Sequence, residues 1–212
     1  YINITLLGDE NNYNYDTEVA FPNNKIIDPN KSYKLEFNGH KLNINKKTFG
    51  RKSKILFEYE NDTLFAYNPF IEAMKNFEIN FLINNDSIGQ YLSRKNYDGS
   101  YSFVTNKIID SYYQFKTKSL GKFYIDYDTI APSIVRNKRV DYKKQIQYYI
   151  KDKETGIKNY EGKINNQWAL FEYEPKLSKI FFYNDTLIKK NKLNRIEIKV
   201  NDLVGNLSLI HI

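Results

Sequence analysis

The sequence has no cysteine and is poor in several other residues: its 212 positions include nine glycines, five prolines, one methionine and one tryptophan. The absence of cysteine excludes disulfides, a thiolate nucleophile and a cysteine-ligated zinc site. It does not identify the compartment, because many bacterial envelope proteins also lack cysteine. The glycines are scattered singly, so the chain has neither a glycine-rich phosphate loop nor a Gly-x-Ser-x-Gly nucleophile elbow.

Long apolar runs are also missing. No segment reaches the roughly 20 apolar residues that a membrane-spanning helix needs. The chain begins with Tyr1 and has no charged segment followed by an apolar one. We therefore expect a piece of a longer precursor, with any targeting signal outside it and no membrane span within it.

Aromatic residues are abundant: they make up 16% of the chain, with 19 tyrosines and 14 phenylalanines, and hydrophobic residues make up 41%. This composition is too apolar for a disordered segment. Isoleucine, tyrosine, phenylalanine and valine suit a half-buried pleated surface, whereas alanine, the best helix former, is scarce. The composition therefore predicts a folded, all-β protein.

Alternation of apolar and polar residues is clearest in the last third of the chain. Ile146, Tyr148 and Ile150 fall on one face of a predicted strand, and the segment 194–200 repeats the pattern. Between these strands, Asn165-Asn166 predicts a tight hairpin turn. We count about seven strands from 133 to 212, which predicts an antiparallel β-sandwich of immunoglobulin-like size.

The preceding part shows the same kind of hairpins. Asn38-Gly39 is a strong turn signal, although His40 makes the predicted loop slightly longer than minimal, and further turns are expected at 60–62 and 96–99. The whole chain is thus predicted to be all-β, with two tandem immunoglobulin-like sandwiches. We expect residues 1–17 to be the tail of a preceding β domain, 18–126 to form the first sandwich and 127–212 the second.

Three turn motifs stand out: "DTIAP" at 128–132, "IKDKETGI" at 150–157 and "VNDLVGN" at 200–206. Their aspartates can accept backbone N–H bonds, their glycines can take positive φ, and the proline suits the start of an edge strand. The residues with these structural roles are Asp128, Pro132, Asp152, Gly156, Asp202, Gly205 and Asn206.

The same aspartates raise the question of calcium. Asp126, Asp128, Asp152 and Asp202 all fall in predicted loops or at strand ends, and oxygen clusters there can bind hard cations. There is no EF-hand spacing, and the sequence does not place Asp152 and Asp202 relative to the domain boundary. We therefore favour turn capping for Asp128, Asp152 and Asp202, and keep calcium binding as the alternative.

Trp168, the single tryptophan, lies in "NNQWALFEY". A lone aromatic ring on a sandwich can serve as a platform for a sugar. More often such a residue packs in the core, as the buried tryptophan of immunoglobulin domains does. We predict a core or inter-sheet role for Trp168.

A net charge of +7 at pH 7 raises the question of an anionic partner, such as nucleic acid, a membrane surface or an acidic wall polymer. The lysines are spread along the chain, and pairs such as Lys46-Lys47 and Lys189-Lys190 never extend into a long basic run. This distribution is typical of a solvated surface, and we expect no nucleic-acid partner.

Taken in order, "LGKFYIDYDTIAPSI", "IKDKETGIKNYEGKINNQWALFEYEPKLSKIFF" and "LNRIEIKVNDLVGN" resemble the C-terminal immunoglobulin-like accessory region of lysostaphin-type (LytM-like) zinc metallopeptidases of Bacteroidota. The resemblance covers the chain from about Leu120 to the end and is weaker from Phe49 to Thr117. It implies a secreted or envelope location, in the periplasm or at the outer surface. It also implies a parent enzyme that cleaves peptidoglycan.

Zinc peptidases of that family need a His-x-His motif and a further His and Asp to hold the metal. This chain has only His40 and His211, far apart in sequence. We therefore expect no catalytic residue and no cofactor in this segment, with zinc in a catalytic domain that precedes it. The expected role is to space that domain or dock it against peptidoglycan, a surface glycan or a protein.

Two other classes of function remain open. The main alternative is an adhesin or glycan-binding module of a surface protein without a peptidase. A β-sandwich with its own glycosidase-like active site ranks below both, because no pair of carboxylates is spaced to share an obvious cleft.

Overall fold

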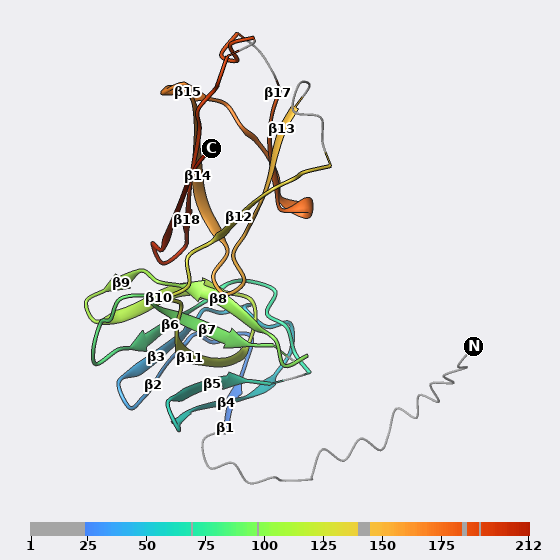
Figure 1. The fold of residues 1–212 in the computed structure, drawn as a ribbon. Helices are drawn as coiled ribbons and strands as arrows, with labels where there is room; N and C mark the ends of the chain where they lie inside the picture. The colour runs from blue at the N-terminus through green and yellow to red at the C-terminus, as the bar shows by residue number, and fades with distance from the viewer. Residues whose placement is uncertain (1–23, 69, 97, 140–144, 184–185, 191) are drawn as a thin grey trace.

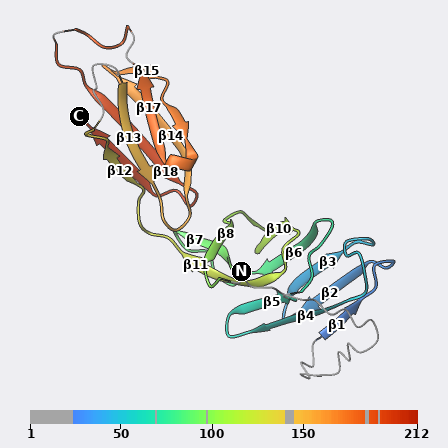
Figure 2. The ribbon, with the colours of Figure 1, turned by 90° about the vertical axis from the view of Figure 1, so that its right-hand side faces the viewer.

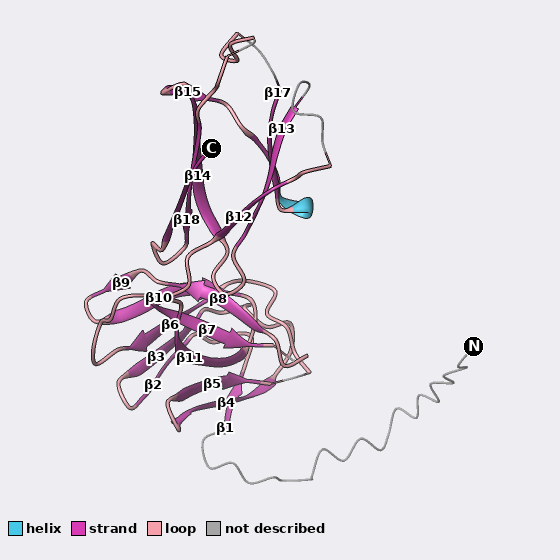
Figure 3. Ribbon diagram, in the orientation of Figure 1, coloured by secondary structure: helices cyan, strands magenta, loops and turns pink. Residues whose placement is uncertain are grey.

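The computed structural model describes residues 24–68, 70–96, 98–139, 145–183, 186–190 and 192–212. These residues form four antiparallel sheets and one turn of 3₁₀ helix, Pro175–Leu177 (Figures 1 and 3). The prediction of an all-β, antiparallel sandwich is confirmed. The expected tail at 1–17 lies outside the described residues. Within the described ranges, no helix is long and apolar enough to cross a membrane.

Two sheets make up the N-terminal sandwich. The strands of the first sheet lie in the order β1 (Asn24–Ile27), β4 (Ser53–Glu60), β5 (Thr63–Tyr67), β11 (Gly121–Tyr127), β7 (Gln90–Lys95) and β8 (Tyr101–Thr105). Those of the second lie in the order β2 (Tyr33–Phe37), β3 (His40–Ile44), β6 (Phe77–Leu82), β10 (Tyr112–Thr117) and β9 (Ile108–Ile109). We call this pair of sheets the first sandwich.

Two further sheets make up the C-terminal, second sandwich. One contains β12 (Ser133–Arg136), β13 (Gln145–Lys151), β17 (Lys179–Tyr183) and β16 (Glu172–Glu174), in that order. The other contains β15 (Gln167–Ala169), β14 (Ile157–Ile164), β18 (Ile196–Asp202) and β19 (Leu207–His211). Figures 1 and 2 show this sandwich standing on the first one, above β7, β8 and β11.

Each sandwich has a hydrophobic core of its own. The first is rich in aromatic rings, among them Phe77, Phe81 and Phe123. The second is mainly aliphatic and includes Ile146 and Ile150 from one face of β13, as the alternation in that strand predicts. The expected boundary, near Asp126 and Tyr127, coincides with the end of β11, and the next strand begins at Ser133.

Several hairpin turns use the residues that the sequence singles out. Asn38 and Gly39 have φ of +48° and +79°, and Asn165 and Asn166 have +53° and +66°, as two-residue hairpin turns require. The predicted longer loop at His40 is wrong, because His40 pairs with Phe37 as the first residue of β3. The strong local propensity of these turns fixes the register of both hairpins.

The segment "QWALFEY", which follows the Asn165-Asn166 turn, does not form one continuous strand. It divides into β15 and β16, which belong to different sheets of the second sandwich. Phe171 lies where the chain crosses between the sheets, and its side chain is buried in the core. Its ring packs directly over Gly162 of β14. The crossing therefore depends on the buried ring of Phe171 and on Gly162, which has no side chain to clash with it.

His40 is a buried histidine of the first sandwich, 3% exposed. Its ring lies 4.2 Å from the ring of Tyr59 and 4.6 Å from that of Phe81, measured between centroids. Its Nδ1 accepts the backbone N–H of Leu82 at 3.1 Å. Burial lowers the pKa of His40 from 6.5 to about 4, so the imidazole is neutral at pH 7.

Acidification should therefore weaken the first sandwich. Between about pH 6.5 and pH 4, His40 is protonated in the unfolded chain but stays neutral in the folded chain. The free energy of unfolding should fall by about 3 kcal/mol across this window from His40 alone. Urea denaturation at several pH values measures the slope. His40→Gln, which keeps an acceptor for Leu82, should show a shallower slope, whereas an unchanged slope would refute the assignment.

Candidate functional site

The three turn motifs meet at the end of the second sandwich that faces the first. Asp128 follows β11, Asp152 follows β13 and Asp202 ends β18. Figures 1 and 2 show the two sandwiches joined at this end. We call the loops 128–132, 152–156 and 202–206 the junction.

Asp202 is fully buried and closes the turn between β18 and β19. Its Oδ1 accepts the backbone N–H groups of Val204, Gly205 and Asn206 at 3.0, 2.7 and 2.8 Å. Its Oδ2 accepts the side-chain amide of Asn206 at 2.7 Å. The positive φ of Gly205, +102°, lets the backbone curl around the carboxylate.

Asp152 has the same role in the turn between β13 and β14. Its Oδ1 accepts the backbone N–H groups of Thr155 and Gly156 at 2.8 and 2.7 Å. Gly156 has φ of +87°, so both glycines of the turn motifs have the positive φ that the sequence predicts. Asp152 is half-buried, and the hydroxyl of Thr155 also lies 3.4 Å from its Oδ1.

Asp128 connects the three loops. It is 1% exposed, and its Oδ1 accepts the backbone N–H of Ile130 at 3.0 Å. Its Oδ2 accepts the hydroxyl of Thr155 at 2.8 Å, and its carbonyl oxygen accepts the side-chain amide of Asn206 at 3.0 Å. Asp128 therefore bonds to both of the other turns.

The structure thus brings together the three aspartates that the sequence marks as alternatives for calcium. One carboxylate oxygen of each lies within 4.8 Å of the others. Asp126 is not part of this group: it accepts the hydroxyl of Tyr91 at 3.2 Å and the backbone N–H of Tyr127. Burial, followed by the nearby charge of Asp126, raises the pKa of Tyr91.

Two chemical roles suit three clustered carboxylates. Carboxylate oxygens are ligands for a hard cation such as calcium, which takes six to eight oxygens. They are also strong acceptors for backbone N–H groups in turns. Six backbone N–H groups, a hydroxyl and a side-chain amide already bond to them. No Lys, Arg or His of the described residues forms an ion pair with any of the three.

The junction also bonds to the first sandwich. The backbone N–H of Asp128 donates to the carbonyl oxygen of Gly89, just before β7, at 2.9 Å. The side-chain amide of Asn106 donates to the carbonyl oxygen of Leu203 at 2.7 Å. Gly89 has φ of +77°, and a Cβ there would lie 2.4 Å from the carbonyl oxygen of Asp128. The close approach of the two sandwiches therefore requires glycine at this position.

Some residues of the junction have no clear signal in the sequence. Thr155 follows Asp152 by three residues in a turn, which is a local pattern, but its bond to Asp128 is a tertiary contact. Gly89 and Asn106 lie in loops of the first sandwich that carry no motif. The sequence thus singles out the three aspartates that lie together, but not the residues that anchor them.

The predicted core role of Trp168 is wrong. Its side chain is 63% exposed on β15, while its neighbours Ala169 and Phe171 are buried. Because the segment divides into two strands, Phe171 rather than Trp168 points into the core of the second sandwich. Trp168, Leu170 and Tyr183 lie exposed along a shallow groove of about 380 Å³.

Trp168→Ala should therefore leave the fold nearly unchanged. Because most of the ring is in water, the expected loss in free energy of unfolding is below about 1 kcal/mol. Phe171→Ala provides the matched comparison, with an expected loss of about 3–5 kcal/mol from a buried aromatic. Chemical denaturation followed by far-UV circular dichroism measures both. A large loss for Trp168→Ala would restore the core role.

The two histidines do not form a common site. His40 is buried in the first sandwich, and His211 lies on β19 of the second, where its Nε2 is 2.9 Å from Oε2 of Glu197. The hydrogen bond to His211 lowers the pKa of Glu197. Neither histidine lies in the aspartate cluster.

No family model matches this chain, and no curated protein matches it. The function must therefore be inferred from the fold, the junction and the surface.

Proposed function

We propose that this chain is a non-catalytic accessory region of a secreted or envelope protein that resembles peptidoglycan metallopeptidases. Its role would be to hold the catalytic domain at a fixed distance and orientation from the wall. The observation that carries this proposal is the junction, where one buried aspartate, Asp128, is bonded to both sandwiches. No cofactor is needed for such a role.

The strand order supports an immunoglobulin-like classification of the second sandwich. The order β12-β13-β17-β16 corresponds to strands A, B, E and D, and β15-β14-β18-β19 corresponds to C′, C, F and G. The first sandwich, with one six-stranded and one five-stranded sheet, is larger than the seven to nine strands of immunoglobulin domains. Its assignment as a second, enlarged immunoglobulin-like unit remains part of the proposal.

The connection between the sandwiches supports a spacer role. Only residues 128–132 separate β11 from β12. Asp128 at the start of this segment forms hydrogen bonds with Gly89, Ile130 and Asn206. The Ser208 hydroxyl also donates to the carbonyl oxygen of Pro132. A flexible linker would leave these backbone groups to water and allow the domains to reorient.

Because the chain has no cysteine, spin labels can be placed at single introduced cysteines. We would label Lys34→Cys and Lys199→Cys, both at exposed lysines on different sandwiches, and measure their separation by double electron–electron resonance. A rigid spacer should give one narrow distance distribution. Gly89→Ala should broaden it. Gly99→Ala, with a similar φ of +82° and open space around it, should not. A broad distribution in the parent chain would refute the rigid spacer.

The link to a peptidase has its own test. Translating the gene upstream of Tyr1 should reveal a His-x-His motif and a further His and Asp in a preceding domain. An upstream region without these residues would remove the peptidase from the proposal. A rigid junction would still remain.

A glycan-binding module is the second candidate function, and the exposure of Trp168 favours it. An exposed ring beside Leu170 and Tyr183 presents a flat apolar surface of the kind on which sugar rings stack. The chain should then sediment together with purified, insoluble peptidoglycan, and the Trp168→Ala variant should stay in the supernatant. If both proteins sediment equally, or if neither does, the glycan-binding role of Trp168 is refuted and only the spacer role is left.

A further inference from the structure

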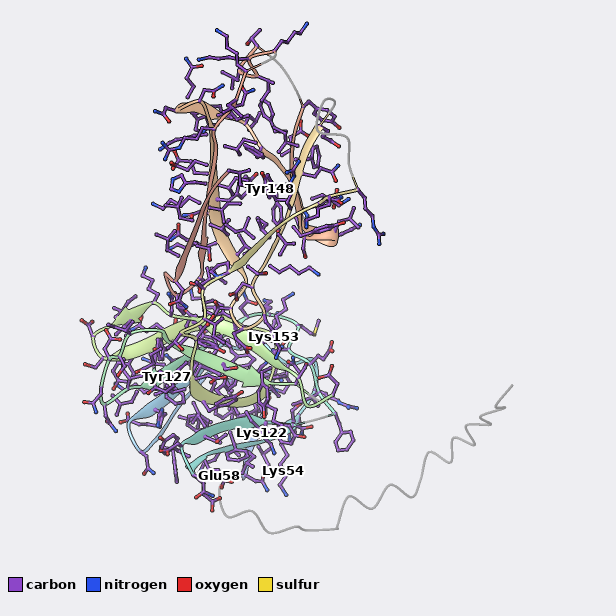
Figure 4. All side chains as sticks on the ribbon, viewed as in Figure 1. Lys54, Glu58, Lys122, Tyr127, Tyr148 and Lys153 are labelled. Carbon is purple, nitrogen blue, oxygen red and sulfur yellow. The ribbon has the colours of Figure 1, made fainter. Side chains whose placement is uncertain are left out.

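The first sandwich carries a basic pocket at the end away from the junction. The pocket has a volume of about 400 Å³ and is formed by the ends of β5 and β7 and by the start of β11. Four cationic residues line it, Arg94, Lys95, Lys118 and Lys122, together with one acidic residue, Glu72. Figure 4 shows Lys122 farther from the second sandwich than Tyr127, which ends the same strand.

The positive charge in this basic pocket is not neutralised from within. In the described part of the chain, Arg94, Lys95 and Lys118 form no ion pair. Several like charges within one concave surface repel each other and attract an anion, because the low-dielectric walls focus their field. A solvated surface would have spread these charges or interspersed them with carboxylates.

Arg94 is held in place by its surroundings. Its aliphatic stem crosses Gly121, where a Cβ would lie 2.8 Å from Cγ and Cδ of the arginine. Its Nη2 donates to Oδ1 of Asn96 at 3.1 Å. Asn96 is fixed in turn by bonds from its Nδ2 to the hydroxyls of Ser100 and Ser102 at 3.0 and 2.7 Å. The guanidinium is thus pre-organised, which reduces the entropy lost on binding.

Two lysines are positioned by aromatic rings of the same sheet. Nζ of Lys122 lies 5.2 Å from the ring centroid of Phe65 and 5.4 Å from that of Tyr67. Nζ of Lys95 lies 5.8 Å from the ring centroid of Tyr101, which is largely exposed. These cation–π contacts orient the ammonium groups without removing their charge.

We propose that this basic pocket binds the anionic group of an acidic saccharide, a carboxylate or phosphate on one or two sugar rings. The pocket volume lies in the range of small-molecule sites, roughly 300–1,000 Å³. The fork of Arg94 matches the paired oxygens of a carboxylate or phosphate. This site is independent of the spacer role.

Nucleic acid fits the pocket less well. A single-stranded nucleic acid needs a basic groove that follows several nucleotides, with free aromatic faces for the bases. Here Lys122 lies over the rings of Phe65 and Tyr67, so these faces are not free for bases. A short anionic ligand is therefore the better match, and a thymidine oligomer serves as the competing probe.

The test is a titration of the ¹⁵N-labelled chain followed by amide chemical shifts. A trigalacturonate and glucose 6-phosphate represent the two sources of the anion, and maltotriose is the neutral control. At least one acidic saccharide should give saturable shifts at residues 94–96 and 118–122, weakened by added salt. Arg94→Gln and Lys118→Gln should each weaken binding about tenfold. Lys199→Gln, an exposed lysine of the second sandwich, should not.

Lys118 is exposed, so Lys118→Gln keeps the test valid if Arg94→Gln does not fold. The proposal is overturned if neither acidic saccharide gives saturable shifts, or if Lys118→Gln and Lys199→Gln weaken binding equally. Binding of inorganic phosphate as tight as that of glucose 6-phosphate would reduce the site to one for a bare anion. Tighter binding of the thymidine oligomer would assign it to nucleic acid.

Discussion

Asp202→Ala is expected to lower the free energy of unfolding of the second sandwich by about 3–4 kcal/mol. The substitution removes the acceptor for the backbone N–H groups of Val204, Gly205 and Asn206 and for the side chain of Asn206, at a fully buried position. Each buried donor left without a partner costs about 1–3 kcal/mol, less where water can enter. Asp202→Asn keeps one oxygen and should lose less.

Urea denaturation of each variant measures this loss, with amide signals of the two sandwiches followed separately by NMR. Asp86→Asn is the matched control, because Asp86 is exposed in a loop of the first sandwich and should lose almost nothing. The first sandwich should keep its own stability in all variants, since its core is separate. A loss below about 1 kcal/mol for Asp202→Ala would contradict the capping role.

Denaturation of the parent chain and of Asp152→Asn decides whether the aspartates also bind calcium. If they act only as turn caps, adding millimolar calcium or a chelator should leave the denaturation midpoint of the parent chain unchanged. A cation bound to the folded state alone would raise the midpoint with concentration. A rise in the parent chain that disappears in Asp152→Asn would assign a cation site to the cluster.

Gly162→Ala is expected to destabilise the second sandwich by about 3 kcal/mol or more. The new Cβ would lie 2.1 Å from Cδ2 and 2.4 Å from Cε2 of Phe171. The ring cannot move far, because it is buried in the core and the backbone carbonyl of Phe171 accepts the hydroxyl of Tyr160 at 2.8 Å. The crossing between the two sheets would have to shift to relieve the clash.

Thermal unfolding followed by NMR would show a lower midpoint for the second sandwich and little change in the first. Gly50→Ala is the matched control, since its new Cβ would meet only the flexible Met74 side chain, 3.1 Å from its sulfur. Phe171→Leu combined with Gly162→Ala should recover part of the loss by removing the clash. No recovery in the double variant would show that the ring is not the cause.

Most strands and turns could be predicted from local sequence. Alternation in β13 and β18 and the turn residues Asn38-Gly39 and Asn165-Asn166 act over a few neighbouring positions, and the structure has each of them. The failure at Trp168 has a physical cause. Alternation in "QWALFEY" gives two equivalent faces, and only the crossing between sheets determines that Phe171, not Trp168, enters the core.

The basic pocket is a second feature that could not be predicted from local sequence. Along the sequence the lysines are spread out, which predicts a solvated surface. Folding brings Arg94 and Lys95 of β7 next to Lys118 and Lys122, because β7 and β11 are neighbours in the sheet. A cluster made of residues from two strands leaves no run that the sequence could reveal.

The sequence by itself determined an all-β chain and the turns that Asp128, Asp152 and Asp202 cap, since strand alternation and turn chemistry are local properties. Only the tertiary structure decided that these three carboxylates meet at one junction, that Gly89 lets the sandwiches touch there, and that four cations share a pocket. These features depend on contacts between residues distant in sequence, which are set by how the sheets pair and pack.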